Sequence, residues 1–151
     1  MILDLSSGRR NIWHNKEAKG VVYLDIREGV KPDCVADSTQ LPFADSQFSL
    51  IVFDPPHTTF GPNSQMAQRY GSFKAHEIRA IVSATAAEAA RVATGDALMS
   101  FKWSNHGHCS FEKILGLMAS WWEPLFGHTV SIRTKHASTT QWIVLRRNHN
   151  L

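Results

Sequence analysis

The chain is poor in cysteine and has no long apolar run, and both absences narrow what it can be. Its 151 residues include only two cysteines, Cys34 and Cys109, which are too few for a disulfide framework. No segment approaches the roughly 18 consecutive apolar residues that a membrane-spanning helix needs. The N-terminus also lacks the charged-then-apolar pattern of a signal peptide. We therefore expect one domain over residues 1–151, with no membrane segment and a cytoplasmic location.

The chain also has little net charge. Charged residues make up 19% of the chain and hydrophobic residues 43%, a balance typical of a folded domain rather than a disordered one. Sixteen lysines and arginines against 13 acidic residues give a net charge of +3. This small excess is compatible with a nucleic-acid partner but does not require one.

Short apolar runs separated by loops predict an α/β fold with mainly parallel strands. The expected strands are Met1–Leu5, Val21–Ile26, Cys34–Ala36, Leu50–Phe53 and Ala97–Trp103, with a final hairpin formed by Thr129–Thr134 and Gln141–Leu145. Helical spacing of apolar residues predicts helices over Phe73–Thr94 and Phe111–Trp122, the second stopped by Glu123-Pro124. Because parallel strands need crossovers of about a dozen residues, the short connections early in the chain predict abbreviated helices there.

Four aspartates stand at or near the ends of the predicted parallel strands: Asp4, Asp25, Asp37 and Asp54. Ligands of open α/β sheets bind beyond the carboxyl ends of the strands, where the strand order switches. The repetition therefore predicts a binding site at this edge.

These segments resemble class I methyltransferases that use S-adenosylmethionine. Ile2–Gly8 resembles the first strand and its glycine turn, Tyr23–Ile26 the second strand with its terminal acid, Val35–Phe43 the adenine-contacting segment, and Phe48–His57 the Asp-Pro-Pro-aromatic motif of amino-methyltransferases. The resemblance covers nearly the whole chain and implies a Rossmann-like sheet with a C-terminal antiparallel hairpin. The small, early-starting form is similar to phage- or prophage-type enzymes.

The resemblance implies where S-adenosylmethionine would bind. Asp4 and Gly8 would flank its methionine moiety, Asp25 would accept from the ribose hydroxyls, and Asp37 from the adenine amine, with Leu41 or Phe43 against the ring. The full implied cofactor set is Asp4, Ser6, Gly8, Asp25, Ile26, Asp37, Leu41, Phe43 and Asp54. The first motif has one glycine where the family often shows two or more.

The segment Asp54-Pro55-Pro56-His57 carries the implied catalysis. An exocyclic or amide nitrogen is a poor nucleophile because its lone pair is delocalised. A carboxylate and a backbone carbonyl that accept its two hydrogens direct that lone pair at the methyl group, and two prolines hold these acceptors in place beforehand. The family usually has Tyr, Phe or Trp at the position of His57, whose imidazole is smaller and can be protonated.

The resemblance and the position of the following segments predict substrate contacts from Phe60, Arg69 and Tyr70, and from Lys102 and Trp103 at the end of the fifth strand. His106, His108 and Cys109 suggest a metal site, but no second ligand cluster with zinc-like spacing accompanies them, and we expect no metal.

The sequence therefore predicts a methyltransferase acting on an amino nitrogen, favouring the exocyclic amine of adenine or cytosine in DNA or RNA. One alternative is methylation of a protein glutamine amide or a small-molecule amine. The other is an inactive domain that binds the cofactor, or nothing, and serves a structural role. The chain would act as a monomer or homodimer.

Overall fold

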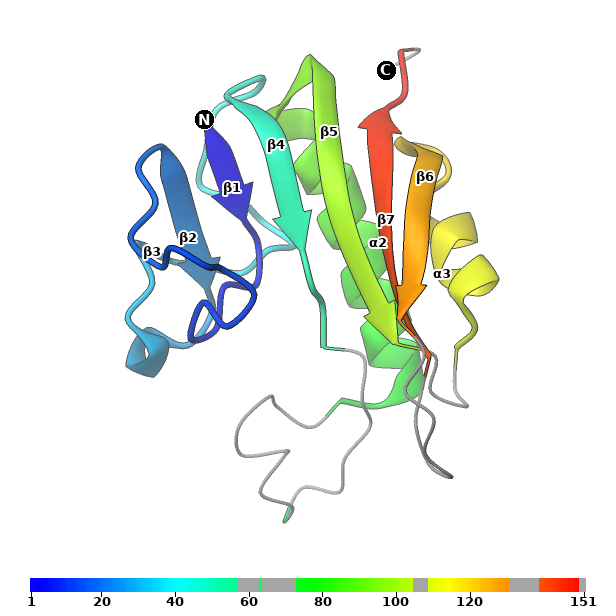
Figure 1. Cartoon of the computed structure of the whole chain (residues 1–151), viewed down its shortest axis with the longest axis horizontal. Helices are drawn as coiled ribbons and strands as arrows, with labels where there is room; N and C mark the ends of the chain where they lie inside the picture. The colour runs from blue at the N-terminus through cyan, green and yellow to red at the C-terminus, as the bar shows by residue number, and fades with distance from the viewer. Residues whose placement is uncertain (57–62, 64–72, 105–108, 131–138, 150–151) are drawn as a thin grey trace.

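The computed structural model describes residues 1–56, 63, 73–104, 109–130 and 139–149. Within these residues the strands form one sheet: β1 (Ile2–Asp4), β2 (Val21–Asp25), β3 (Cys34–Val35), β4 (Phe48–Phe53), β5 (Ala93–Ser104), β6 (Trp122–Val130) and β7 (Thr140–Arg147). Their order across the sheet is β3-β2-β1-β4-β5-β7-β6 (Figure 1). This confirms the predicted Rossmann-like architecture.

The first five strands run parallel to one another, so their carboxyl ends meet at one edge of the sheet. Leu3, Leu24, Ile51 and Phe53 are buried in these strands, as expected for strands apolar on both faces. The connections are as short as predicted. The β2–β3 connection contains only the 3-10 turn η1 (Glu28–Val30), and no α-helix occurs between β1 and β2.

The C-terminal strands are antiparallel, as predicted, but the boundaries of β6 were wrong. The expected strand Thr129–Thr134 begins at Trp122 instead, and residues 131–134 lie outside the described part. Pro124, expected to stop the preceding helix, lies within the strand at an irregularity in its pairing with β7. An edge strand with a bulge accommodates proline because no ladder hydrogen bond is lost there.

Two helices cover one face of the sheet, α2 (Ala75–Val92) and α3 (Phe111–Met118). Both end earlier than predicted. Thr94-Gly95-Asp96 belongs to β5 rather than to a helix stop, and α3 ends at Met118 instead of Trp122. The main core lies between these helices and the sheet, with large buried side chains such as Phe101, Ile114 and Trp122.

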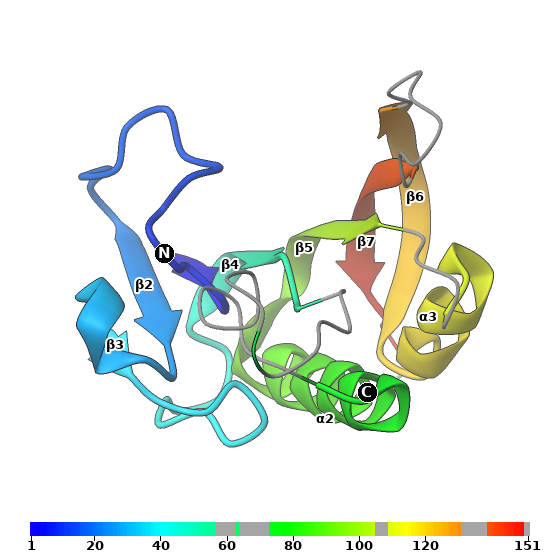
Figure 2. The same ribbon diagram turned by 90° about the horizontal axis from the view of Figure 1, so that it is seen from below.

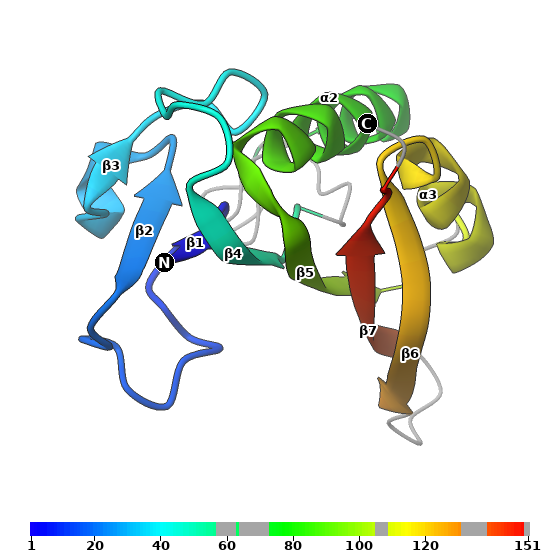
Figure 3. The same ribbon diagram turned by 90° about the horizontal axis from the view of Figure 1, so that it is seen from above.

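The other face of β4, β5, β7 and β6 carries no described helix, as Figures 2 and 3 show from opposite sides. Alternation along β5 and β7 separates the two faces. Phe101 and Trp103 point into the core, so Ser100 and Lys102 face the open side. We call this surface the open face. Among the described helices, none is long and apolar enough to cross a membrane.

Side-chain hydrogen bonds hold the long β1–β2 connection. Arg10 bonds to Asp33 at 3.2 Å and to the Lys16 carbonyl at 2.6 Å, and its guanidinium lies 3.9 Å from the centre of the Tyr23 ring. Trp13 meets the same ring edge to face at 5.3 Å. Polar and aromatic contacts thus replace the missing helix here.

Candidate functional site

The candidate site lies at the carboxyl edge where β1 and β4 are neighbours. The chain leaves β1 toward β2 on one side and leaves β4 toward β5 on the other, so the strand order switches between them. Such a switch point opens a crevice in α/β sheets. The structure places Asp4, Asp25 and Asp54 at the ends of β1, β2 and β4, as predicted, and Asp37 two residues beyond β3.

Ser6 joins the two strands that flank this switch point. Its hydroxyl donates to the Asp54 carbonyl at 2.9 Å and accepts from the Asp54 amide at 3.1 Å. Leu5 extends the connection, since its amide donates to the Val52 carbonyl at 2.9 Å. Ser6 therefore fixes the backbone from which the Asp54 side chain projects, whatever else it binds.

Asp54 forms an ion pair with Lys102. The lysine Nζ lies 2.6 Å from the Asp54 Oδ2, and both side chains are about one-fifth exposed. The pairing follows from the register, because Phe53 stands opposite Phe101 and the next residue on each strand then shares the open face. Pro55 is buried and Pro56 is half-buried behind this carboxylate.

Several residues singled out in the sequence lie outside the described part of the chain. They are the predicted catalytic residue His57, the predicted substrate contacts Phe60, Arg69 and Tyr70, and His106 and His108. Within the described part of the chain, no three potential ligands gather to hold a metal ion.

Asp25 is buried and its carboxylate is fully hydrogen-bonded. Oδ2 accepts from the Gly8 amide at 2.9 Å, and Arg27 donates to both oxygens through its guanidinium and also through its backbone amide. Burial alone would raise the pKa of Asp25, but the bonds from Arg27 and Gly8 outweigh it and lower the pKa. Gly8 has a φ of 51°, a conformation that favours glycine.

The surroundings of Asp4 shift its pKa in the opposite direction. Its side chain has no exposed surface, and it accepts from the Trp13 indole at 2.6 Å and the Ser6 amide at 3.2 Å. Burial raises the pKa of Asp4 to about 6, helped by the nearby charges of Asp54 and Asp25 and opposed by the two hydrogen bonds. The pKa values of two acids on adjacent strand ends are thus shifted in opposite directions.

The two side chains predicted to contact adenine have partners in the core. Leu41 is buried in the core, and Phe43 packs edge to face on Phe48 at 5.1 Å. Phe48 begins β4 and therefore lies at the amino edge, far from the switch point. Ile26, also in the predicted set, is 65% exposed directly after Asp25, and Val35 at the end of β3 is 54% exposed. These two provide the apolar surface at the carboxyl edge.

Trp103 also departs from prediction. Expected at the substrate mouth beside Lys102, its ring is 2% exposed, stacks with Phe101 and donates from Nε1 to the Cys109 carbonyl at 3.2 Å. Consecutive residues of a strand point to opposite faces, so both could not line one opening. Trp142, which the sequence did not single out, lies opposite Lys102 in β7, with the lysine Nζ 5.6 Å from its ring centre.

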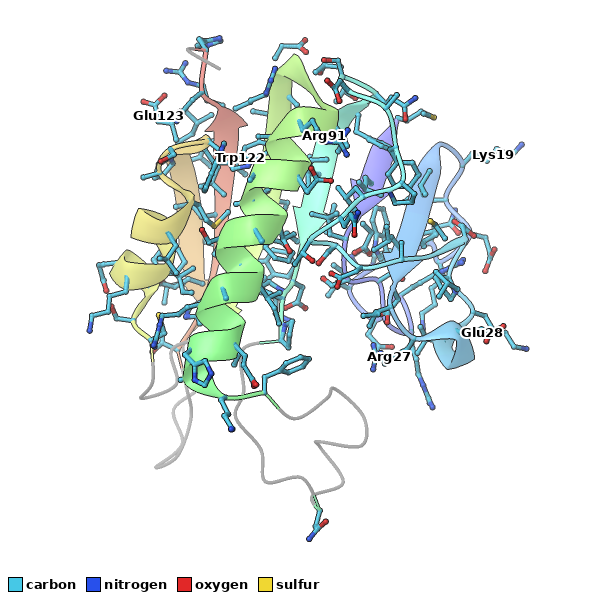
Figure 4. The ribbon with its side chains drawn as sticks, turned by 180° about the vertical axis from the view of Figure 1, so that it is seen from behind. Lys19, Arg27, Glu28, Arg91, Trp122 and Glu123 are labelled. Carbon is cyan, nitrogen blue, oxygen red and sulfur yellow. The ribbon has the colours of Figure 1, made fainter. Side chains whose placement is uncertain are left out.

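Two charged residues of α2 position the segment that follows Asp37. Glu88 accepts from the Leu41 amide at 2.8 Å, and Arg91 donates to the Leu41 and Phe43 carbonyls and to Asp45. Figure 4 shows Arg91 near the end of α2 and Arg27 beside η1, toward opposite ends of the parallel strands. Sequence reasoning missed Trp13, Arg27, Glu88 and Arg91, because their partners are distant in the chain or become visible only in the folded structure.

Comparison with known proteins identifies the fold. No family model and no curated protein matches the chain. Among solved structures, it is similar to an S-adenosylmethionine-dependent methyltransferase from Methanosarcina mazei, with a TM-score of 0.65 and 14% identity over 96% of this chain and 91% of that one. It is also similar to the N-methyltransferase NodS from Bradyrhizobium japonicum WM9, with a TM-score of 0.63 and 11% identity over 97% of this chain and 84% of that one.

A third neighbour shows how far this likeness extends. The [4+2]-cyclase SpnF matches with a TM-score of 0.66 and 12% identity over 96% of this chain and 74% of its own. The chain therefore has the methyltransferase fold, and proteins of this fold include a cyclase. The activity has to be inferred from the residues of the site rather than from the fold.

Proposed function

We propose that the protein is a methyltransferase that transfers a methyl group from S-adenosylmethionine to an amino nitrogen. The observation that carries the proposal is Asp54-Pro55-Pro56 at the switch point, with its backbone clamped by Ser6 and its carboxylate held by Lys102. The finer proposal is that the nitrogen is the exocyclic amine of adenine or cytosine in DNA or RNA.

The residues at the carboxyl edge fit this cofactor. The lowered pKa of Asp25 keeps an ionised acceptor at the end of β2, where ribose hydroxyls would donate. Exposed Ile26 beside it offers an apolar surface to a ring. The hydroxyl of Ser7 is buried between the exits of β1 and β2 and has no partner among the described residues. For ribose hydroxyls to bind Asp25, the Arg27 guanidinium must first leave it. Each carboxylate oxygen of Asp25 already accepts two hydrogen bonds.

The cofactor, when bound, supplies an electrophilic methyl group on a sulfonium. The chain's own residues orient the acceptor nitrogen. The Asp54 carboxylate and the carbonyl of Pro55 accept the two N–H hydrogens and hold the lone pair in one direction. Lys102 holds that carboxylate in one position through their ion pair, so Asp54 serves as an acceptor, and the proton leaves once the nitrogen carries the methyl group.

The alternative substrate class, a protein amide or a small-molecule amine, would need the same acceptors for nitrogen. Nucleic acid is favoured by the open surface beside Asp54, since Lys102 and Trp142 adjoin it on a sheet face that no described helix covers. A buried pocket would instead be expected for a small amine.

The test is a methyl-transfer assay with labelled S-adenosylmethionine, offering DNA, RNA and total protein separately. Label in a methylated adenine or cytosine, identified by nucleoside mass spectrometry, is expected for the wild-type protein and lost in Asp54→Ala. Asp96→Ala is the matched control, because Asp96 is an exposed acid near the start of β5, far from the switch point. Label only in protein would move the substrate to an amide, and no transfer with cofactor binding intact would contradict catalysis on all three.

A further inference from the structure

The open face carries a row of side chains that starts at the candidate catalytic carboxylate. Lys102 stands beside Asp54, Trp142 opposite Lys102, and His128 opposite Trp142. Neighbouring strands are about 4.8 Å apart, so this row crosses four strands in roughly 14 Å. The pairing registers of the four strands place these four side chains on one face of the sheet.

Aromatic surface on this face remains uncovered. Phe126 pairs with Val144 two residues along from the His128 pair and therefore points to the same side; it is 67% exposed. Trp142 is half-buried with a cation near its ring. Diagonal neighbours on paired strands lie about 7–8 Å apart, so Phe126 and Trp142 are neighbours on this face.

Charged side chains of both signs lie on this face. Its cations Lys102 and Arg146 are each paired with an acid, Asp54 and Glu123 respectively. Arg146 pairs with Glu123 at 2.8 Å, but both side chains are about half exposed, and such pairs are weak. A guanidinium held this loosely is available to a phosphate.

We propose that the open face of β5, β7 and β6, defined by Lys102, Trp142, His128, Phe126 and Arg146, binds a single strand of nucleic acid and leads a base to Asp54. Exposed aromatic rings stack with bases, and interspersed cations follow the backbone; proteins that bind single strands combine these two features. The inference rests on the proposed function for its direction toward Asp54, but binding itself does not depend on catalysis.

A second copy of the chain is the competing occupant. The centres of protein interfaces are depleted of charge, whereas Lys102 lies in the middle of this row. Pro124 and the adjoining irregularity in β6 also disfavour pairing at the exposed edge of the sheet. These features favour nucleic acid over a protein partner.

The experiment is fluorescence anisotropy of labelled single-stranded DNA and RNA oligonucleotides with the wild-type protein and three variants. Phe126→Ala should weaken binding about 5- to 100-fold, the range for losing one base–aromatic stack. Arg146→Ala should weaken it several-fold and reduce the salt slope by about 1. Lys113→Ala removes the same charge from exposed α3 on the helix-covered side and should change neither.

The outcomes separate cleanly once circular dichroism confirms that the variants fold. Equal binding by all variants, or no binding by the wild-type protein, would overturn the inference. So would a dimer in sedimentation that Phe126→Ala dissociates, since the face would then belong to a second copy. A parallel calorimetric titration with S-adenosylhomocysteine tests the proposed function independently: its failure would leave the binding result unchanged.

Discussion

The two halves of the molecule are stabilised in different ways. The half built from β4 to β7 has its core under α2 and α3, with Val82, Met99, Phe101 and Ile114 entirely buried. The half built from β1 to β3 has no α-helix among its described residues, and polar side chains fasten its connections. The candidate site lies at the junction, so a rigid packed half presents Asp54 and Lys102 while a hydrogen-bonded half presents Asp4 and Asp25.

The largest expected effect is in the packed half. Phe101→Ala should lower the free energy of unfolding by about 3–5 kcal/mol, because it removes a fully buried ring and leaves a cavity. Arg10→Ala, in the hydrogen-bonded half, should cost about 1 kcal/mol. Urea denaturation of both variants checks the difference, and equal losses would break the comparison.

The second effect depends on pH and belongs to Asp4. Its pKa is raised to about 6 in the folded protein, so the folded state holds a proton that the unfolded state releases. Stability should therefore fall as pH rises from about 4 to 6 and change little above that. Asp4→Asn removes this titration, and its stability relative to the wild-type protein should rise by on the order of 2–3 kcal/mol across that window. If the free energy of unfolding changed equally with pH in the two proteins, the raised pKa of Asp4 would be contradicted.

The third effect tests the link between the halves. Arg91→Ala removes the donor that holds the Leu41 and Phe43 carbonyls and should destabilise the protein by about 1–2 kcal/mol. Arg79→Ala, a half-buried arginine elsewhere on α2, serves as the matched control and should cost less. Thermal unfolding of both measures this contrast; if they lose the same stability, the segment is held by other contacts.

The smallest effect is expected at Arg27. Arg27→Ala removes the guanidinium that occupies Asp25, so S-adenosylhomocysteine should bind several-fold more tightly by calorimetry. The free variant should melt lower, because the buried Asp25 carboxylate loses the two guanidinium donors and keeps only the Gly8 and residue-27 backbone amides. Weaker binding would indicate that Arg27 contacts the cofactor instead of competing with it.

Apolar patterning predicted most of the fold. The five parallel strands, both helices and the antiparallel hairpin follow from runs such as Leu50–Phe53, because burial on both faces leaves an unambiguous sequence pattern. The start of β6 escaped prediction since Pro124 and its neighbours look like a turn, and only pairing with β7 makes them a strand. Element ends depend on such tertiary contacts more than on local preference.

The positions of the candidate site residues in the fold were predicted in part for the same reason. Aspartates that end strands are visible in the sequence, so Asp4, Asp25, Asp37 and Asp54 were placed correctly. Trp103 was misplaced because strand alternation sends it to the opposite side from Lys102. Arg27 and Trp13 were missed because the hydrogen bonds that they make to Asp25 and Asp4 are set by a connection without regular structure.

The central claim is that the carboxyl edge between β1, β2 and β4 binds S-adenosylmethionine. Calorimetric titration of S-adenosylhomocysteine into the wild-type protein and into Asp25→Ala tests it most directly. We expect saturable one-site binding that Asp25→Ala weakens at least tenfold, since the ribose hydroxyls would lose their ionised acceptor. An absence of binding by the folded wild-type protein, or equal affinity in the two, would contradict it.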